Sequence, residues 1–306
     1  SAAARRLGGR AIPIRARVER VAGDWADALE ADNQAFAVVE MRRKLRVGVV
    51  DADGGLVAAD APIPPHRWLK LALEPLSPGA IELTDLPADG LGTEQLDLLD
   101  AVFLLRPDRL ADSAWSALGD FVRSRGMLWC FVPSLAQPES ASWGPSLIEQ
   151  FDLDWRVGIE MLEAQNGQEM GWHLLGDSTQ VVVPEPLQIL ASDFAALLRP
   201  IRVKRRIDIQ VGTGAGADQN VWLRINNEAR SPLLVAAGVG DGTVLLLGTA
   251  LNPQWTNLPT KPLFIPLLHE SLRSVVGESP RLLRLSTSVC GDQPRLDQQW
   301  SGAQRL

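Results

Sequence analysis

Apolar residues recur along this chain with the periods of strands and helices in alternation. Leu45–Val50 is a short β-branched run that predicts a strand. Ala101–Leu105 and Met127–Val132 are apolar runs typical of strands buried on both faces of a sheet. Between the last two, apolar residues three and four apart predict a helix that begins at Asp112 or Ser113 and is capped by Gly126. This order of strand, helix and strand indicates a parallel sheet with right-handed connections.

Other parts of the chain extend the same α/β pattern. We expect a helix over His66–Leu73, a strand over Ala80–Leu83, and a last helix over Pro266–Val276. Leu233 to Leu251 is apolar enough to be tested as a membrane span, but three glycines around Asp241 favour a tight hairpin turn. We therefore predict two buried strands there, Leu233–Val239 and Thr243–Gly248.

The pattern is weaker in the middle and at the end of the chain. We expect an irregular insertion at about 138–220, with these short elements in and just after it: helix Ser146–Phe151, strand Gln180–Val183, a helical turn at Asp193–Leu198, and strands Ile201–Val211 and Val221–Ile225. Residues 279–306 lose apolar periodicity, which predicts a loosely packed tail.

The first 44 residues read as a separate β unit. Alternation at Ile12–Val18 and an extended run at Phe36–Glu40 predict a strand pair, either a short β hairpin or the remnant of a β-sandwich. Residues 1–46 carry ten basic and six acidic side chains, whereas residues 47–100 carry two and ten. This change of sign supports a boundary there, with the basic start either a solvated edge or an arm for a membrane or nucleic acid.

Composition narrows the class of protein. The 306 residues are 46% hydrophobic and 22% charged, which excludes a disordered chain. Two cysteines exclude a disulfide scaffold or a cysteine-based zinc module, and a net charge of −7 argues against a nucleic-acid-binding protein. Three histidines and no tyrosine leave little material for acid–base chemistry.

Cys130 is the first residue to test as a nucleophile, because it lies near the carboxyl end of a predicted parallel strand. A nucleophile elbow needs small neighbours, and Trp129 and Phe131 instead continue the strand, so a buried structural thiol is favoured. A bond between Cys130 and Cys290 stays open. We predict no metal site, because His66 and His173 lack metal-ligand spacing with any partner.

Two further patterns are weighed and set aside. The glycine-rich stretches at 212–216 and 238–242 lack the strand–loop–helix context of a phosphate site, so no cofactor is predicted. Five cations within Arg199–Arg206 have no interleaved aromatic residues, which favours a charged strand edge over a nucleic-acid patch.

The ends of the predicted strands supply the candidate binding surface. In open α/β sheets, ligands bind at the carboxyl ends of the strands. The candidate residues of this rim are Asp51, Arg106, Ser134, Asn252, Trp255 and Asn257. Trp255 with the two asparagines forms either a recognition surface or a packed cover over the sheet end with turn-capping amides.

With these residues laid out, the chain resembles the class I glutamine amidotransferase-like domain of bacterial BatA-type (aerotolerance-operon-like) membrane proteins. The matching stretches are Leu45–Asp51, Ala101–Pro133 and Gly242–Val276, and the last is the most specific. The segment that ends at Ala31-Asp32-Asn33 resembles the close of the β-sandwich that often precedes this domain.

The resemblance implies a mostly parallel, flavodoxin-like sheet over residues 45–278, with flanking helices. It also implies an extracytoplasmic domain of a membrane-anchored bacterial protein, held by membrane segments outside residues 1–306, with a protein partner in the cell envelope. It carries over no catalytic residue. The family's enzymes use an elbow cysteine and a His-x-Glu pair, whereas Cys130 lacks the elbow and His269-Glu270 has the wrong spacing.

Three hypotheses follow. The first is a non-catalytic interaction or structural domain of a cell-envelope membrane protein. The second is an unrecognised or degenerate hydrolase or amidotransferase-like enzyme that uses the rim near Asp51, Arg106, Ser134 and Asn252, which a deep pocket there would favour. The third is a sugar or nucleotide binding module with Trp255 as its stacking platform.

Overall fold

The computed structural model describes residues 10–17, 34–41, 44–51, 63–74, 81–133, 143–164, 171–176, 181–212 and 220–275. By its internal contacts the chain divides into two units: Lys44–Ser279, and Ser1–Arg43 with Pro280–Leu306. In the smaller unit, β1 (Arg10–Arg17) and β2 (Gln34–Met41) pair antiparallel over their whole length. The predicted tail, Cys290 and Ser134 lie outside the described residues.

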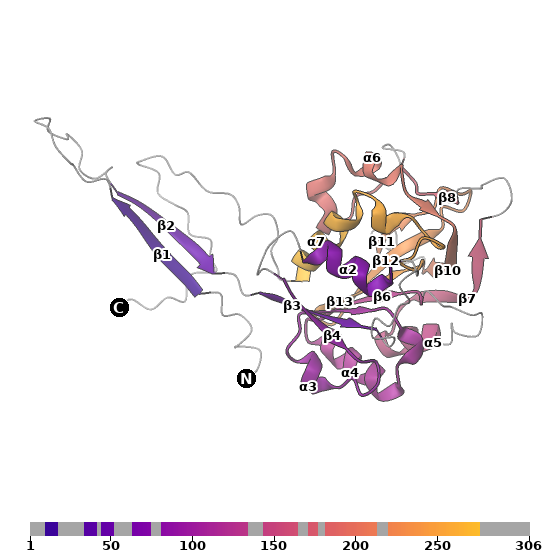
Figure 1. Ribbon diagram of the computed structural model, residues 1–306, viewed down its shortest axis with the longest axis horizontal. Coiled ribbons are helices and arrows are strands. Elements are labelled where there is room, and N and C mark those ends of the chain that lie inside the picture. Colours follow the sequence, from indigo (N-terminus) through magenta and orange to yellow (C-terminus); the bar gives the residue numbers. More distant parts are fainter. Residues whose placement is uncertain are drawn as a thin grey trace, which may run out of the picture. The chain divides into compact units, whose positions relative to one another are not determined.

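The larger unit is built on a seven-stranded sheet (Figure 1). Its strands, in spatial order, are β11 (Val221–Arg224), β12 (Pro232–Val239), β13 (Gly242–Leu247), β6 (Met127–Phe131), β5 (Ala101–Leu104), β3 (Leu45–Val50) and β4 (Ile81–Leu86). The five strands from β13 to β4 are parallel to one another, and β12 and β11 add to β13 antiparallel. The predicted mixed α/β sheet is therefore confirmed.

Helices cover both faces of this sheet (Figure 1). One face packs against α2 (Pro65–Leu73), the 3-10 turn η4 (Glu185–Leu190), α6 (Phe194–Leu198) and α7 (Phe264–Val275). The other packs against α3 (Thr93–Leu96), α4 (Asp112–Arg123) and α5 (Trp143–Phe151). All residues of β5 and β6 are buried, because both strands are covered on two sides. The 3-10 turn η2 (Pro107–Arg109) follows β5. The 3-10 turn η6 (Leu258–Thr260) precedes α7.

The hairpin predicted around Asp241 is confirmed. Val239 pairs with Gly242, so Gly240 and Asp241 form a two-residue turn, and Gly240 takes a positive φ of 60° that favours glycine. The adjoining strands are almost fully buried. Their apolar character therefore reflects the centre of a sheet, and no described helix is long and apolar enough to cross a bilayer.

The stretch from 138 to 220 is more regular than the sequence pattern predicted. It contains β7 (Trp155–Glu163), which pairs antiparallel with β10 (Arg205–Val211), and β8 (Trp172–His173), which pairs with β9 (Arg202–Val203). The predicted strand at Gln180–Val183 is wrong over its described part, because Val181–Val183 forms no strand. Helix α6 is confirmed.

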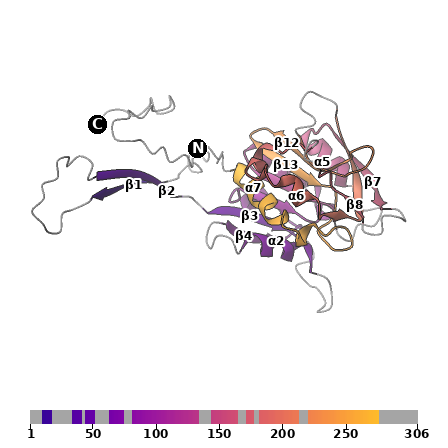
Figure 2. The same cartoon turned by 90° about the horizontal axis from the view of Figure 1, so that it is seen from above.

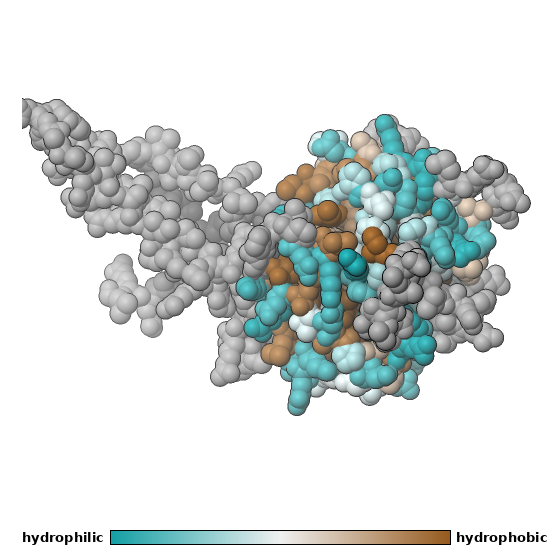
Figure 3. All heavy atoms as spheres, in the orientation of Figure 1, coloured by the Kyte–Doolittle hydropathy of each residue, from teal (hydrophilic) through white to brown (hydrophobic). Residues whose placement is uncertain are grey.

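The surface of the larger unit mixes polar and apolar residues. Over the region of α2 and α7, hydrophobic residues lie among hydrophilic ones (Figure 3). Leu71 and Ile265 are partly exposed there, at 48% and 39%. At one end of the sheet, β3 and the edge strand β4 lie next to α2 (Figure 2). This end holds the first candidate residue, Asp51.

Candidate functional site

The carboxyl ends of β3 and β5 meet at one edge of the sheet. Asp51 follows β3 directly, and the backbone N–H of Leu105 donates to the carbonyl of Val50 at 3.0 Å, so β5 keeps its pairing to the end. In the chain, β3 is followed by β4 on one side and then by β5 on the other. The connections leave β3 in opposite directions, and such a reversal is where open α/β sheets form their ligand crevice.

A histidine joins Asp51 at this edge. The Nδ1 atom of His66 lies 2.8 Å from Oδ2 of Asp51, and each side chain is 16% exposed. When Nδ1–H donates to the carboxylate, the neutral imidazole keeps a lone pair on Nε2. No hydrogen bond to Nε2 is found within the described part of the chain. The pair is thus an oriented imidazole with one nitrogen available as a base.

The local sequence fixes the position of His66. Pro65 opens α2, where its missing N–H costs no helical hydrogen bond, and His66 follows in the first turn. The apolar face of α2, with Leu69 and Leu73, packs into the core. At the other end of α2, the carbonyl of Ala72 is hydrogen bonded to Nε2 of His269 at 3.0 Å. His269 therefore anchors α2 to α7 and is not paired with Glu270, whose carboxylate instead accepts from Arg273.

Arg106 lies just beyond β5 and is already engaged. Its Nε and Nη2 atoms donate to the two carboxylate oxygens of Asp108, each at 2.9 Å, and both side chains are nearly buried. Along β5, Phe103 and Leu105 face the α2 side of the sheet and Leu104 faces the α4 side, so strand alternation places Arg106 on the α4 side. Asp51 instead contacts His66 of α2.

Cys130 lies inside β6 and is fully buried. Burial, and to a smaller degree the negative charge of Asp108, raise the pKa of the Cys130 thiol well above its ordinary value of 9.0. The thiol is free and stays protonated at neutral pH, whereas a cysteine nucleophile requires the thiolate. Cys130 is therefore a packing residue of the core.

The loop after β13 is built from internal contacts. The Oδ1 atom of Asn252 accepts the backbone N–H groups of Gln254 and Trp255, and Oδ1 of Asn257 accepts the N–H of Arg202. Trp255 is 2% exposed and packs into the core on the α4 side. A ring buried in this way offers no stacking platform, so the sugar or nucleotide module built on Trp255 is not supported.

The cation cluster after α6 also has structural roles. Arg206 is 5% exposed and was expected on a solvated edge. Its Nη1 atom lies 3.1 Å from Oδ1 of Asp208, and its guanidinium lies 5.4 Å from the ring centroid of Trp172. Arg205 pairs with Glu163 across the β7–β10 sheet. Over the described residues, no group of three potential metal ligands is found.

Two cavities of about 300 Å³ lie away from this edge. One is lined by residues around β11, and the other by residues around the start of β7 and the end of β10. Neither is lined by Asp51, Arg106 or Asn252. Of the predicted rim, the structure thus brings Asp51 together with His66, a residue that the sequence reasoning had considered only as a metal ligand.

No protein-family model and no curated protein matches the sequence. Solved structures do resemble it. A cytoplasmic protein of Salmonella typhimurium aligns with a TM-score of 0.52 at 13% identity, over 86% of this chain and 95% of its own. A second cytoplasmic protein of that organism gives 0.48 at 14% identity, over 87% and 97%. The β-galactosidase of Rahnella sp. R3 gives 0.49 at 14% identity, over 77% of this chain and only 32% of its own.

These matches correct the first hypothesis. The sequence predicted a non-catalytic domain of a cell-envelope membrane protein in an extracytoplasmic location. The structure that aligns with a TM-score of 0.52 is described as a cytoplasmic protein, not as a membrane, envelope or amidotransferase-like protein. The predicted cell-envelope role and location are therefore contradicted. At these identities the likeness itself establishes the α/β fold.

Proposed function

We propose that this protein is a hydrolase in which the Asp51–His66 pair activates water. The observation that carries the proposal is the 2.8 Å contact between Nδ1 of His66 and Oδ2 of Asp51 at the carboxyl end of β3. A carboxylate that holds Nδ1 fixes the tautomer in which Nε2 accepts a proton, and it stabilises the imidazolium that then forms.

The substrate class that suits this pair is a small ester or amide. Nε2 of His66 takes one proton from water as its oxygen forms a bond to the carbonyl carbon. The tetrahedral intermediate then collapses, the bond to the leaving oxygen or nitrogen breaks, and His66 returns the proton to that atom. Water is the nucleophile, because Cys130 is buried within β6.

We further propose that the sheet is flavodoxin-like. The spatial order β4-β3-β5-β6-β13 corresponds to the order 2-1-3-4-5 of that fold when the parallel strands are numbered along the chain. In this scheme the reversal of strand order falls between β3 and β5. Asp51 stands at that reversal, which supports placing the reaction there.

The test is the hydrolysis of a panel of small esters and amides, with glutamine among them, by the full chain. We expect saturable activity that falls by about a hundredfold or more in His66→Asn, because general-base catalysis contributes roughly 10²–10⁴. Asparagine keeps an N–H donor toward Asp51 but has no basic nitrogen. Asp51→Asn should also lose activity, because an amide that donates to Nδ1 selects the wrong tautomer.

The matched controls are His173→Asn and Cys130→Ala. His173 is an exposed histidine on β8, and Cys130 is the buried thiol, so both variants should retain the activity of the wild type. A wild-type rate equal to that of buffer would overturn the proposal, as would His66→Asn that folds normally and keeps full activity. Loss of activity in Cys130→Ala with an unchanged melting temperature would favour amidotransferase-like chemistry instead.

A further inference from the structure

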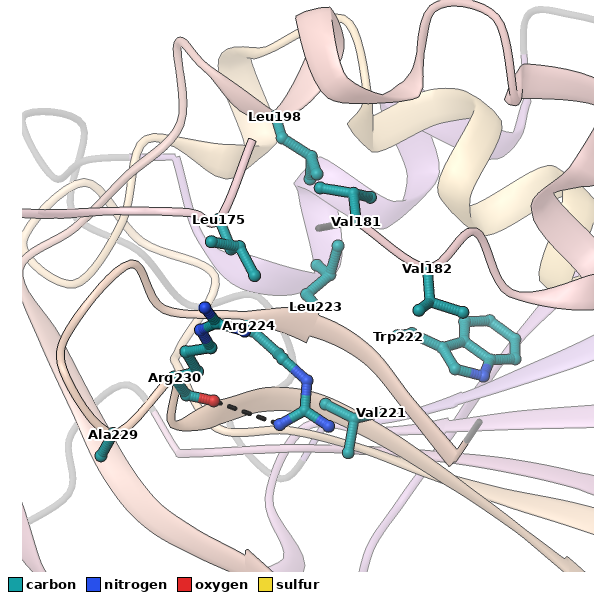
Figure 4. Close-up of a pocket in the computed structure, with 10 residues that line it drawn as sticks. All are labelled: Leu175, Val181, Val182, Leu198, Val221, Trp222, Leu223, Arg224, Ala229 and Arg230. Carbon is teal, nitrogen blue, oxygen red and sulfur yellow. Dashed lines mark hydrogen bonds between the residues drawn. The ribbon is translucent and has the colours of Figure 1, made fainter. Parts of the chain in front are cut away.

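The cavity beside β11 has the composition of a ligand site. Its volume is about 310 Å³, at the lower end of the range of small-molecule pockets. It lies between β11, the extended segment at 181–182, α6 and the turn that joins β11 to β12 (Figure 4). The lining residues are Leu175, Val181, Val182, Leu198, Val221, Trp222, Leu223, Arg224, Ala229 and Arg230. Eight of these ten are apolar and the other two are arginines.

Arg230 and the Trp222–Val182 pair lie at different ends of the cavity. In Figure 4 the guanidinium of Arg230 points toward Leu175 and that of Arg224 lies near Val221, whereas Trp222 and Val182 lie next to each other at the other end. Nη1 of Arg224 donates to the carbonyl of Arg230 at 3.2 Å, which ties the arginines to one another. Among the described residues that line the cavity there is no carboxylate, and the exposed Glu228 of the same turn is not one of them.

The backbone conformation of Arg230 indicates that the turn does not need an arginine at this position. Its φ is +47°, in the left-handed region that glycine or asparagine adopts most readily. The turn itself is held by Asn227, whose Oδ1 accepts the N–H of Ser231 at 2.9 Å and whose carbonyl accepts the N–H of Arg230 at 3.0 Å. Neither bond uses the side chain of Arg230, which forms no ion pair within the described residues. The turn therefore does not require an arginine there.

Val182 gives the cavity an exposed apolar surface. It is 61% exposed although it lines the cavity, and Trp222 beside it is largely buried. An apolar ligand body placed between Arg230 and Val182 would remove the exposed Val182 surface from water, which is favourable. The same ligand would meet the positive charge of Arg230 at its other end.

We propose that this cavity binds a small organic carboxylate, with the anionic group at Arg230 and an aliphatic body against Trp222 and Val182. The site lies at β11, five strand spacings or about 24 Å across the sheet from β3. It is therefore separate from the Asp51–His66 pair and goes beyond the proposed hydrolysis. Octanoate has both features of the proposed ligand and serves as the probe.

The test is calorimetric titration of the full chain with octanoate, octanol and octylamine. We expect octanoate to bind measurably and the uncharged and cationic analogues to bind at least about tenfold more weakly, because a charge-assisted hydrogen bond is lost. Val182→Asp should also weaken octanoate binding by about tenfold or more, since it places a carboxylate beside the ligand.

Arg230→Gly separates binding from folding. Glycine suits the positive φ, so this variant should melt at or above the wild-type temperature while it binds octanoate about tenfold more weakly. Arg156→Gln removes an exposed arginine on β7 that does not line the cavity, and it should bind like the wild type. The proposal is overturned if octanoate fails to bind, if octylamine binds equally well, or if Arg230→Gly binds as tightly as the wild type.

Discussion

Cys130 illustrates how a single side chain takes its chemistry from its surroundings. The same thiol would be a candidate nucleophile on an exposed turn, but here it lies between Trp129 and Phe131 inside β6. Its pKa is raised by burial and by the nearby charge of Asp108. Since the folded state holds the proton that an unfolded thiol would release, this shift has a consequence for stability at alkaline pH.

We predict that Cys130 lowers stability above pH 9. Below the ordinary pKa of 9.0, both states carry the protonated thiol and the shift has no effect. Above it, the unfolded chain loses a proton that the folded chain keeps, so the free energy of unfolding falls by about 1.4 kcal/mol for each further pH unit. Urea unfolding at pH 8 and pH 10 should therefore show a larger loss for the wild type than for Cys130→Ala.

Lysine and arginine side chains titrate alike in the wild type and in Cys130→Ala. The difference between the two losses of stability therefore reports the thiol of Cys130. Cys290 should be replaced by serine in both, which leaves Cys130 as the one cysteine that differs. Equal losses between pH 8 and pH 10 would show that the thiol of Cys130 is solvated or ionised in the folded state.

The Asp51–His66 pair shows what residue-level reasoning found and missed. Asp51 was predicted at the rim because it follows an apolar strand directly. His66 was tested only for metal-ligand spacing, and fifteen residues separate it from Asp51. The available signal was positional: a residue after a parallel strand and a residue in the first turn of the next helix lie at the same edge of a sheet. Their 2.8 Å contact needed the structure.

At the scale of elements, the end of α4 departs from the predicted cap. Gly126 was expected to cap the helix, but Arg125 takes the left-handed conformation, with φ of 93°. The N–H of Gly126 donates to the carbonyl of Phe121 at 2.9 Å and that of Arg125 to Val122 at 3.0 Å, the pattern of a Schellman motif. Gly126 is needed one position later, because the ring of Phe121 occupies the space that a side chain there would fill.

Arg125→Gly should therefore stabilise the protein. An L-residue in the left-handed region costs about 1 kcal/mol, which glycine avoids. Because the side chain of Arg125 is exposed, its loss removes little packing, and we expect the melting temperature to rise by about 2–4 °C in calorimetry. Arg125→Ala keeps the strained backbone and should show no such gain. A lower melting temperature for Arg125→Gly would mean that the arginine side chain stabilises this turn.

The sequence predicted well those elements whose pattern of apolar residues has a single structural explanation. Strands β5 and β6 are apolar throughout because both faces are covered, and such runs are unambiguous once helices flank them. Val181–Val183 was mistaken for a strand because a β-branched run can also be extended without a partner, and here it packs over the cavity beside Trp222. Strand β7 was missed because Gly158 interrupts its alternation, and because its pairing with β10 is irregular between Ile207 and Ile209.

At the scale of the whole molecule, the larger unit holds both hydrophobic clusters of the described residues. All residues of both hydrophobic clusters lie between Val47 and Leu272, within Lys44–Ser279. A unit with its own core has what it needs to fold alone. The strand pair of the smaller unit has only β1 and β2 among its described strands, and two strands are marginal by themselves.

We predict that a chain of Lys44–Ser279 unfolds cooperatively. Its urea midpoint, followed by tryptophan fluorescence, should match that of the main transition of the full chain, because all the described core residues are kept. The fragment should also retain the far-ultraviolet circular dichroism of a mixed α/β protein. A midpoint lowered by more than the error of the titration would mean that the removed segments stabilise the larger unit.

The two edge strands of the seven-stranded sheet, β4 and β11, affect whether the protein associates with further copies of itself at high concentration. On β4 the exposed Glu82 and Asp85 form ion pairs with Arg46 and Lys70, so an incoming strand would meet charged side chains. On β11 the pairing with β12 shifts register twice within four residues. The strand is therefore irregular and offers a poor template for pairing with another strand. Charge at one margin and irregularity at the other both discourage strand addition. The sheet is thereby protected against polymerising with further copies of itself into fibres.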